Sequence, residues 1–318
     1  ARDYCLLPQL YFSIIHCRHP DFPHYWDKQH PMRNDPAYGN ENRDFNRYLD
    51  FFHAQVKEVC SNYGKLDLIW FDFSYDDLRG EAWRGTELME MVRSLQPDVV
   101  INNRLEVSGE GYGSLAEGRP TPYHGDFVTP EKMIPPHGLL DVEGRPLVWE
   151  SCVTMNEHWG YCATDNFYKP APMLIKQLVE CVSKGGNMIL NVGPDATGRF
   201  PQRSLEILAE MGRWLDRNGE SIYGCGPAGM EKPEYGRITR KGNTLYYHLY
   251  ENTIGPMPLP GLEKDKVQAI RRLADGTEVL LSTNWVHSDY PDVVFVDLGP
   301  DPVLPDTTDT VLEVRLKD

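Results

Sequence analysis

Asp72 is an acidic residue whose position suggests chemistry. It closes the apolar segment Leu66–Phe71, it has no basic neighbour close in sequence, and no helix pattern starts directly after it. In parallel α/β proteins the reacting groups gather at the carboxyl ends of the strands. We therefore expect a catalytic carboxylate, and the alternative is a turn or surface acid. Other polar residues close the neighbouring segments: Asn102, Asn103 and Arg104, then Glu150 and Ser151, then Asn191.

A nucleophile and a general acid would together require a second carboxylate. The segment 106–145 is rich in Gly, Pro and Tyr, and it is predicted to be a long loop. Loops of this length inside compact domains are usually functional. Spacing alone does not choose between catalysis and a solvated position for the acids of this loop, which are Glu106, Glu110, Glu117, Asp126 and Glu131.

Aromatic residues cluster near the same strand ends. Sugar rings have apolar C–H faces that stack on such side chains, so a carbohydrate site is one interpretation. Ordinary core packing is the other, and it is equally good for Trp70 and weaker for Trp159, which lies in a polar loop. The aromatic residues concerned are Tyr11, Trp70, Phe71, Phe73, Trp159 and Tyr161.

Alternating strands and helices up to about Gly224 must position these residues. Short β-branched or aromatic segments alternate with segments of helical apolar spacing, which indicates repeated βα units around a parallel sheet. Five units are visible, so the predicted fold class is α/β, an incomplete (β/α) TIM-like barrel. The strands are predicted at Leu10–Ile15, Leu66–Phe71, Asp98–Asn102, Leu147–Glu150 and Asn187–Val192, and the helices at Phe45–Tyr63, Glu87–Leu95, Met173–Lys184 and Pro201–Asn218.

The hydrophobic period changes after residue 224. Short alternating or apolar segments follow one another, and Asp275-Gly276 is a strong hairpin signal. We therefore predict two domains, the barrel portion at 1–224 and a small C-terminal antiparallel β-sandwich at 225–318. The sandwich strands are predicted at Tyr235–Arg240, Thr244–Tyr250, Gln268–Leu273, Thr277–Ser282, Asp292–Leu298 and Thr310–Leu316.

Composition limits the classes of partner. The 318 residues include 32 Lys and Arg against 47 Asp and Glu, a formal net charge of −15. Negative charge repels phosphate backbones and anionic lipids, so we expect no nucleic acid, no membrane and instead a neutral small substrate. The first residues lack the features of a signal peptide, which slightly favours a cytoplasmic location for the chain as given. Self-association into a homo-oligomer is left open.

Neither a metal nor a cofactor is predicted. A group of histidines with Asp21 could suggest a zinc site, but its spacing is irregular and two prolines interrupt it, so solvated loop histidines are the better interpretation. The seven cysteines are scattered, and no C-x-x-C pair indicates a zinc ribbon or a disulfide framework. The histidines are His16, His19, His24 and His30.

With these residues in view, the sequence resembles the α-L-fucosidases of glycoside hydrolase family 29. The resemblance runs from about Tyr11 to Gly224 in the family's order, and the sandwich after it is similar to the family's second domain. Seven ordered strings carry it: YFSIIHCRHPDF, LIWFDFS, VINNRL, GDFVTPE, WESCVTMNEHWGY, KGGNMILNVGPDATGRFP and NGESIYG.

The resemblance implies a retaining α-L-fucosidase that acts through a covalent glycosyl-enzyme on a fucosylated oligosaccharide or glycoconjugate. It assigns Asp72 as nucleophile and Glu131 as general acid/base, with Glu117 as the fallback for the second role. Arg104 resembles the family's sugar-contacting arginine, and Tyr11, Trp70 and Trp159 match aromatic residues that line the sugar. A nearby Arg104 is expected to favour the ionised form of Asp72.

Some features depart from the family's pattern. The front portion of the family, with a tryptophan-rich entry and paired histidines that hold sugar hydroxyls, is not matched. Phe73 replaces a glycine often seen after the nucleophile, and Cys17 stands where tryptophan is common. Three alternatives therefore stay open: a non-catalytic carbohydrate-binding remnant, a structural subunit completed by another chain, and a related retaining glycosidase such as a galactosidase.

Overall fold

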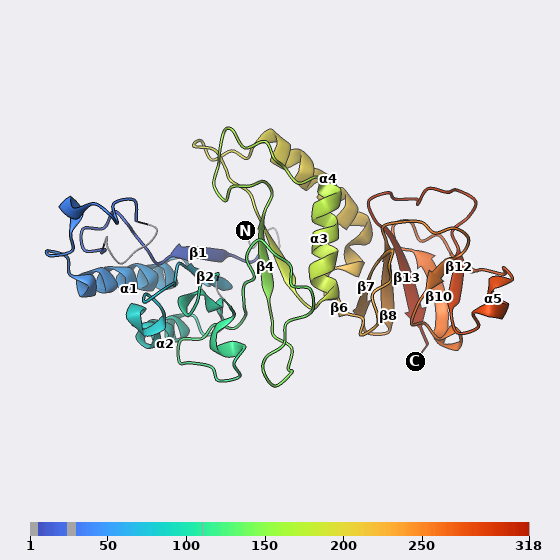
Figure 1. Ribbon diagram of the computed structural model, residues 1–318, viewed down its shortest axis with the longest axis horizontal. Helices are drawn as coiled ribbons and strands as arrows, with labels where there is room; N and C mark the ends of the chain where they lie inside the picture. The colour runs from blue at the N-terminus through green and yellow to red at the C-terminus, as the bar shows by residue number, and fades with distance from the viewer. Residues whose placement is uncertain (1–5, 24–29, 110, 318) are drawn as a thin grey trace. The chain divides into compact units, whose positions relative to one another are not determined.

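The computed structural model describes residues 6–23, 30–109 and 111–317 (Figure 1). The chain divides into two compact units, one formed by 1–130 with 139–149 and the other by 131–138 with 150–318. The predicted domain boundary after residue 224 falls inside the second unit, so this division does not test it and it stays a prediction.

The first unit contains a parallel sheet covered by two helices. The sheet has the order β1-β2-β3, and its core is shared with α1 and α2. Helix α1 begins where the Asp44 carboxylate accepts a hydrogen bond from the Asn46 backbone N–H, which supplies an N-cap. The elements are β1 (Gln9–Ser13), α1 (Phe45–Asn62), β2 (Leu68–Asp72), α2 (Gly85–Leu95) and β3 (Val100–Ile101), with short 3-10 helices at Pro36–Tyr38, Gly80–Trp83, Asn103–Leu105 and Gly113–Leu115.

The register of this sheet decides which side chains meet at its carboxyl edge. Tyr11 is paired with Trp70 and Ser13 with Asp72 across the parallel strands. Strand β3 is only two residues long, but the Asn102 side-chain amide continues the pairing, because it accepts from the Phe71 backbone N–H and donates to the Phe71 carbonyl, both at 2.9 Å. The end of β2 and the segment after β3 therefore lie side by side.

The second unit begins its regular structure with another parallel pair, β4 and β5, connected through α3 and followed by α4. The predicted strand at Leu147–Glu150 is wrong by about three residues. Leu147 donates its backbone N–H to Leu139 and Trp149 bridges to Val128, so pairing with β5 starts at Glu150, which begins a strand and does not close one. The elements are β4 (Glu150–Thr154), α3 (Ala171–Ser183), β5 (Asn187–Asn191) and α4 (Gln202–Asn218), with a 3-10 helix at Gly219–Ser221.

Two antiparallel sheets complete the second unit as a sandwich, in the orders β10-β13-β8-β7-β6 and β11-β12-β9. One core cluster takes residues from both sheets, which is the mark of face-to-face packing. The strands are β6 (Gly226–Pro227), β7 (Gly236–Lys241), β8 (Thr244–Leu249), β9 (Met257–Leu259), β10 (Val267–Arg272), β11 (Leu280–Leu281), β12 (Val294–Asp297) and β13 (Thr310–Leu316), with helices at Lys264–Lys266 and α5 (Val286–Asp289).

Helices α3 and α4 cover the outer face of the five-stranded sheet, as Figure 1 shows. Tyr246 and Val311 point to that face and pack with Trp214 of α4, whereas Tyr247 and Leu312 point into the sandwich. Both faces of β8 and β13 are therefore buried. The predicted fold class, α/β units followed by a C-terminal antiparallel β-sandwich, is confirmed.

Several remaining predictions concern single residue types. His16 and His19 pack against the Phe51 ring, and His30 Nε2 lies 2.8 Å from the Cys17 carbonyl oxygen; His24 lies outside the described residues. Within the ranges that the structure describes, no group of three His, Cys, Asp or Glu side chains is arranged to hold a metal ion, and Cys60, Cys162, Cys181 and Cys225 are in the thiol form. None of the helices in those ranges combines the length and apolar character needed to cross a bilayer.

Candidate functional site

Asp72 is the last residue of β2, and its two carboxylate oxygens are each held by hydrogen-bond donors. The Tyr11 hydroxyl donates to Oδ2 at 2.8 Å, and Arg104 Nη1 donates to Oδ1 at 3.2 Å. The Phe73 backbone N–H also donates to Oδ1, at 2.9 Å. The side chain is 16% exposed, so the carboxylate has a fixed orientation and is still accessible from solvent.

Arg104 is clamped on several sides although it carries a charge. It is only 2% exposed, and it donates through Nε to Thr129 Oγ1 at 2.6 Å and through Nη2 to the Thr129 carbonyl at 3.2 Å. The Thr129 hydroxyl in turn donates to Asn103 Oδ1 at 3.0 Å. Charge-assisted bonds of this kind are stronger than neutral ones, so the guanidinium is a rigid partner for Asp72.

Two aromatic rings lie beside this pair. Tyr11 and Trp70 stack with ring centroids 5.7 Å apart and an interplanar angle of 23°, and the guanidinium carbon of Arg104 lies 4.8 Å from the Trp70 ring centroid. Trp70 is 8% exposed and Tyr11 is 56% exposed. The predicted partners Tyr11, Trp70 and Arg104 are therefore all brought to Asp72.

The turn after Asp72 is strained and is held by a serine that the sequence did not indicate. Phe73 has φ of 84°, a value that side-chain-bearing residues rarely adopt. Ser108 Oγ accepts hydrogen bonds from the backbone N–H groups of Phe73 and Ser74, at 2.9 and 2.8 Å. Strained backbone persists where its surroundings over-determine it, and here it directs one N–H at the Asp72 carboxylate.

Hydrogen bonds within the first unit distinguish the structural acidic residues of the long loop from the exposed ones. Glu106 accepts from the Ser114 backbone N–H at 3.0 Å and from the Thr121 hydroxyl at 2.8 Å, so it organises the loop. Asp126 binds Arg93 and the Ile101 N–H, both at 2.7 Å, and is structural as well. Glu117 and Glu131 are exposed, and Glu110 lies outside the described residues.

Glu131 belongs to the second unit, at the start of the segment 131–138. Its backbone forms a bridge with Cys152, and the next residue, Lys132, donates its N–H to the Cys152 carbonyl at 2.9 Å. Lys132 Nζ donates to the Glu157 carbonyl at 2.7 Å and lies 5.5 Å from the Trp159 ring centroid. Asp72 and Glu131 belong to different units, so their action as a pair stays a prediction.

The loop that carries Trp159 is organised by one buried carboxylate, Asp165. Its Oδ2 accepts from the backbone N–H groups of Glu157 and His158 at 3.0 and 3.1 Å, and it lies 2.7 Å from His158 Nδ1. This contact raises the pKa of His158 and lowers the pKa of Asp165. Trp159 is 38% exposed, and its carbonyl accepts from Asn191 Nδ2 at 2.5 Å.

Ser151 is engaged locally, because its hydroxyl donates to the Met133 carbonyl at 2.6 Å. Thr129 is a supporting residue that the motif GDFVTPE contained and that was not singled out.

Comparisons with known proteins identify relatives of most of the chain. A family model described as Alpha-L-fucosidase matches residues 2–220. An alpha-L-fucosidase of Dictyostelium discoideum is 34% identical over 278 residues, which are 78% of this chain and 56% of that protein. The plasma alpha-L-fucosidase of Homo sapiens is 33% identical over 175 residues, 53% of this chain and 34% of that protein. This chain thus spans about half or less of these two relatives.

Solved structures agree with these sequence matches. Alpha-L-fucosidase isoenzyme 1 from Paenibacillus thiaminolyticus is 51% identical, superposes with a TM-score of 0.95, and is matched over 100% of this chain and 73% of its own. A trapped covalent intermediate of a Bacteroides thetaiotaomicron alpha-L-fucosidase, in complex with 2-fluoro-fucosyl fluoride, is 25% identical with a TM-score of 0.77. That match covers 100% of this chain and 69% of the other.

Proposed function

Because the chain belongs to the alpha-L-fucosidase family, we propose that it hydrolyses terminal α-L-fucose from glycans or glycoconjugates with retention of configuration. The observation that carries this proposal is the Asp72 carboxylate, which is accessible at a strand end and held in one orientation by Tyr11, Arg104 and the Phe73 N–H. The covalent intermediate trapped in the Bacteroides relative supports a nucleophilic step of this kind.

In the first step, an Asp72 oxygen forms a bond to the anomeric carbon while the bond from that carbon to the aglycone oxygen breaks. Tyr11 and Arg104 fix the direction of the attacking oxygen, so little reorganisation is needed when the substrate binds. In the second step, water attacks the same carbon, and the ester bond to Asp72 breaks. Two displacements restore the original configuration.

Glu131 is proposed as the general acid/base, which protonates the departing oxygen and then deprotonates the attacking water. Its exposed position on a segment fixed through the backbone supports this role, because the group must exchange protons with both aglycone and water. A retaining mechanism requires the two carboxyl groups to be about 5–5.5 Å apart in the working enzyme. Glu117 is the alternative for the same role.

Sugar recognition is proposed for Arg104, Tyr11, Trp70 and Trp159. The stacked rings of Tyr11 and Trp70 lie next to Asp72, where the apolar C–H faces and methyl group of fucose would pack. Trp159 offers a further partly exposed ring on an anchored loop.

The test measures release of p-nitrophenol from p-nitrophenyl α-L-fucoside by the 318-residue chain. Asp72→Asn should reduce kcat by about 10⁴-fold. The matched control is Asp77→Asn, an exposed acid five residues later, which should leave the rate unchanged. Proton NMR should show α-fucose as the first product. A wild-type chain that melts cooperatively yet releases no p-nitrophenol would contradict the proposal and favour a carbohydrate-binding protein.

A further inference from the structure

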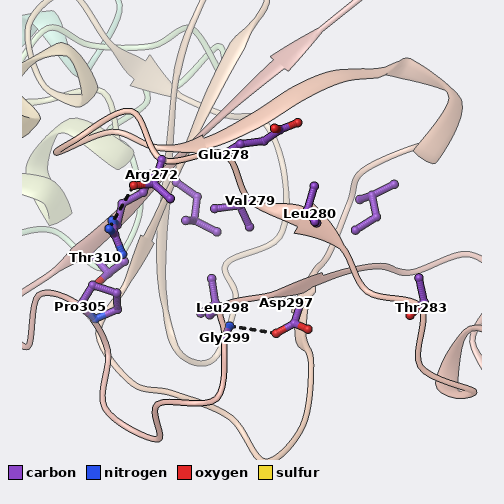
Figure 2. Close-up of a pocket in the computed structure, with 13 residues that line it drawn as sticks. Arg272, Glu278, Val279, Leu280, Thr283, Asp297, Leu298, Gly299, Pro305 and Thr310 are labelled. Atoms are coloured by element: carbon purple, nitrogen blue, oxygen red, sulfur yellow. Dashed lines mark hydrogen bonds between the residues drawn. The ribbon is translucent and has the colours of Figure 1, made fainter.

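A cavity of about 390 Å³ opens in the β-sandwich, and Figure 2 shows the residues around it. All of them come from residues 272–312, so the cavity shares no residue with the elements that carry Asp72 or Glu131. Small-molecule sites typically have volumes of roughly 300–1,000 Å³. The cavity is therefore large enough for one ligand of monosaccharide size or a little larger.

The floor of the cavity is aliphatic. Leu312 is fully buried, and Leu281 and Leu298 are partly buried members of the same sandwich core. Val279 and Pro305 add to this wall. Burial of apolar ligand surface against these side chains would favour binding.

The rim is polar and mixed in charge. Arg272 donates through Nε and Nη2 to Asp275 and through Nη2 to Thr277 Oγ1, which leaves its Nη1 as a remaining donor among the contacts described. On the Asp297 carboxylate, Oδ1 accepts the Gly299 N–H at 2.9 Å, and the side chain is exposed. Thr277, Thr283 and Thr310 also line the cavity.

This combination favours a ligand whose groups both donate and accept hydrogen bonds. The carboxylates of Asp297 and Glu278 would repel an anion in the cavity, and the guanidinium of Arg272 would repel a cation. Hydroxyl groups on an apolar ring satisfy both sides, because they donate to the carboxylates and accept from Arg272 and the threonines. Beyond the rim, Trp285 is 73% exposed two residues after Thr283, and it offers a flat face for a neighbouring ring.

We propose that the sandwich cavity binds one neutral sugar residue of a glycan, as a second carbohydrate site separate from the catalytic one. Such a site would hold the protein near glycosylated material whether or not the Asp72 chemistry proceeds. The proposal goes beyond the hydrolytic function and does not depend on it.

The experiment titrates the full chain, carrying ¹³C-labelled leucine methyl groups, with the neutral disaccharide N-acetyllactosamine. Saturable shifts are expected for Leu281, Leu298 and Leu312, with a Kd of about 1 mM. Leu280→Trp places a large ring at the rim from a position that is 64% exposed, and it should weaken binding by at least tenfold. Asp297→Asn keeps an acceptor for Gly299 but removes the charge, and it should weaken binding about fivefold.

Matched controls make the result specific. Ile254→Trp adds the same ring at a fully exposed position outside the cavity, and Asp292→Asn removes a charge elsewhere on the sandwich; both should leave Kd unchanged. The titration should also be unchanged in Asp72→Asn, which separates this site from the catalytic one. The proposal is overturned if the three leucines do not shift at about 50 mM sugar. It is also overturned if the controls weaken binding equally, or if n-butylamine saturates the cavity more tightly than the sugar.

Discussion

Asp72 and Glu131, the two carboxylates proposed for catalysis, are positioned in different ways. Donors reach both oxygens of Asp72 directly, from a neighbouring strand, a buried arginine and a strained backbone N–H. Glu131 is exposed, and its segment is anchored through the backbone bridge to Cys152 and through the contacts of Lys132. The difference suggests that orientation is built into the nucleophile, which must attack along one line, whereas proton exchange with aglycone and water requires access.

After Asp72→Asn, the substitution with the largest expected effect on this comparison is at Glu131. Glu131→Gln should lower kcat/KM on a fucosyl disaccharide by about 10²–10⁴-fold, because the poor leaving group needs protonation. The loss should be smaller on p-nitrophenyl α-L-fucoside, whose leaving group needs little assistance. Steady-state kinetics on both substrates measures this difference. Glu117→Gln is the matched variant and should leave kcat/KM on both substrates unchanged. If Glu117→Gln lowers kcat/KM on the disaccharide and Glu131→Gln does not, Glu117 is the general acid/base.

Arg104→Lys tests whether the orientation of Asp72 depends on a planar guanidinium. Lysine keeps the charge but cannot bond Asp72 and both Thr129 oxygens in one fork, so kcat/KM should fall about 100-fold. Arg93→Lys is the control, since Arg93 pairs with Asp126 away from the nucleophile. Equal rates for Arg104→Lys and the wild type would show that the hydrogen bonds of the Arg104 guanidinium to Asp72 and Thr129 are not required for catalysis.

Tyr11→Phe removes only the donor to Asp72 Oδ2 and keeps the ring that stacks on Trp70. A hydrogen bond to a charged group contributes about 1.5–3 kcal/mol, so a loss of about tenfold or more in kcat/KM is expected. Tyr63→Phe, at a side chain that is 70% exposed, should have no effect. If Tyr11→Phe changes KM alone, the hydroxyl serves substrate binding and does not orient the nucleophile.

The smallest expected effect concerns the loop next to Lys132. The raised pKa of His158 means that its protonated form is favoured in the folded protein, through its contact with Asp165. That stabilisation is complete below the ordinary histidine pKa of about 6.5 and is lost as pH rises through the raised value. His158→Gln should therefore reduce the free energy of unfolding more at pH 5.5 than at pH 8.5, measured by urea denaturation.

His137→Gln, at another exposed histidine of the second unit, is the control for this pH dependence. A destabilisation by His158→Gln that grows with pH would contradict the assigned role of the His158 contact. The lowered pKa of Asp165 sets a lower pH limit for the same contact. The ionised Asp165 carboxylate stabilises the folded protein, and this stabilisation is lost only as pH falls through the lowered pKa.

Sequence patterns predicted the elements with strong periodicity. The strand Thr310–Leu316 was placed at its observed bounds, and the helix predicted at Phe45–Tyr63 ends one residue earlier. Strand β9 was missed because Pro258 lies within it and prolines flank it at 256 and 260, although it lies at a sheet edge, where proline is tolerated. The strand predicted at Leu147–Glu150 was misplaced because the apolar residues before Glu150 pair with other segments, Leu147 with Leu139 and Trp149 with Val128.

At the candidate site, too, sequence patterns identify residues marked by local position and miss those placed by contacts between distant parts of the chain. Asp72 and Arg104 could be found because Asp72 is the last residue of β2 and Arg104 comes shortly after the end of β3, and sequence alone marks such positions. Ser108 could not be found, since its contacts to Phe73 and Ser74 join residues 34 or 35 positions apart and no local pattern reports them. Thr129 shows an intermediate case, because a motif contained it but only the fold reveals that it holds Arg104.

The interleaved boundaries of the two units affect how the protein can be made. The chain leaves the first unit at residue 130, returns for 139–149 and then leaves again. During synthesis, the first unit therefore lacks its last segment until residue 149 has emerged from the ribosome, by which time residues 131–138 of the second unit are already exposed. A single cut cannot separate the two units, so a truncation that ends at residue 130 would remove part of the first one.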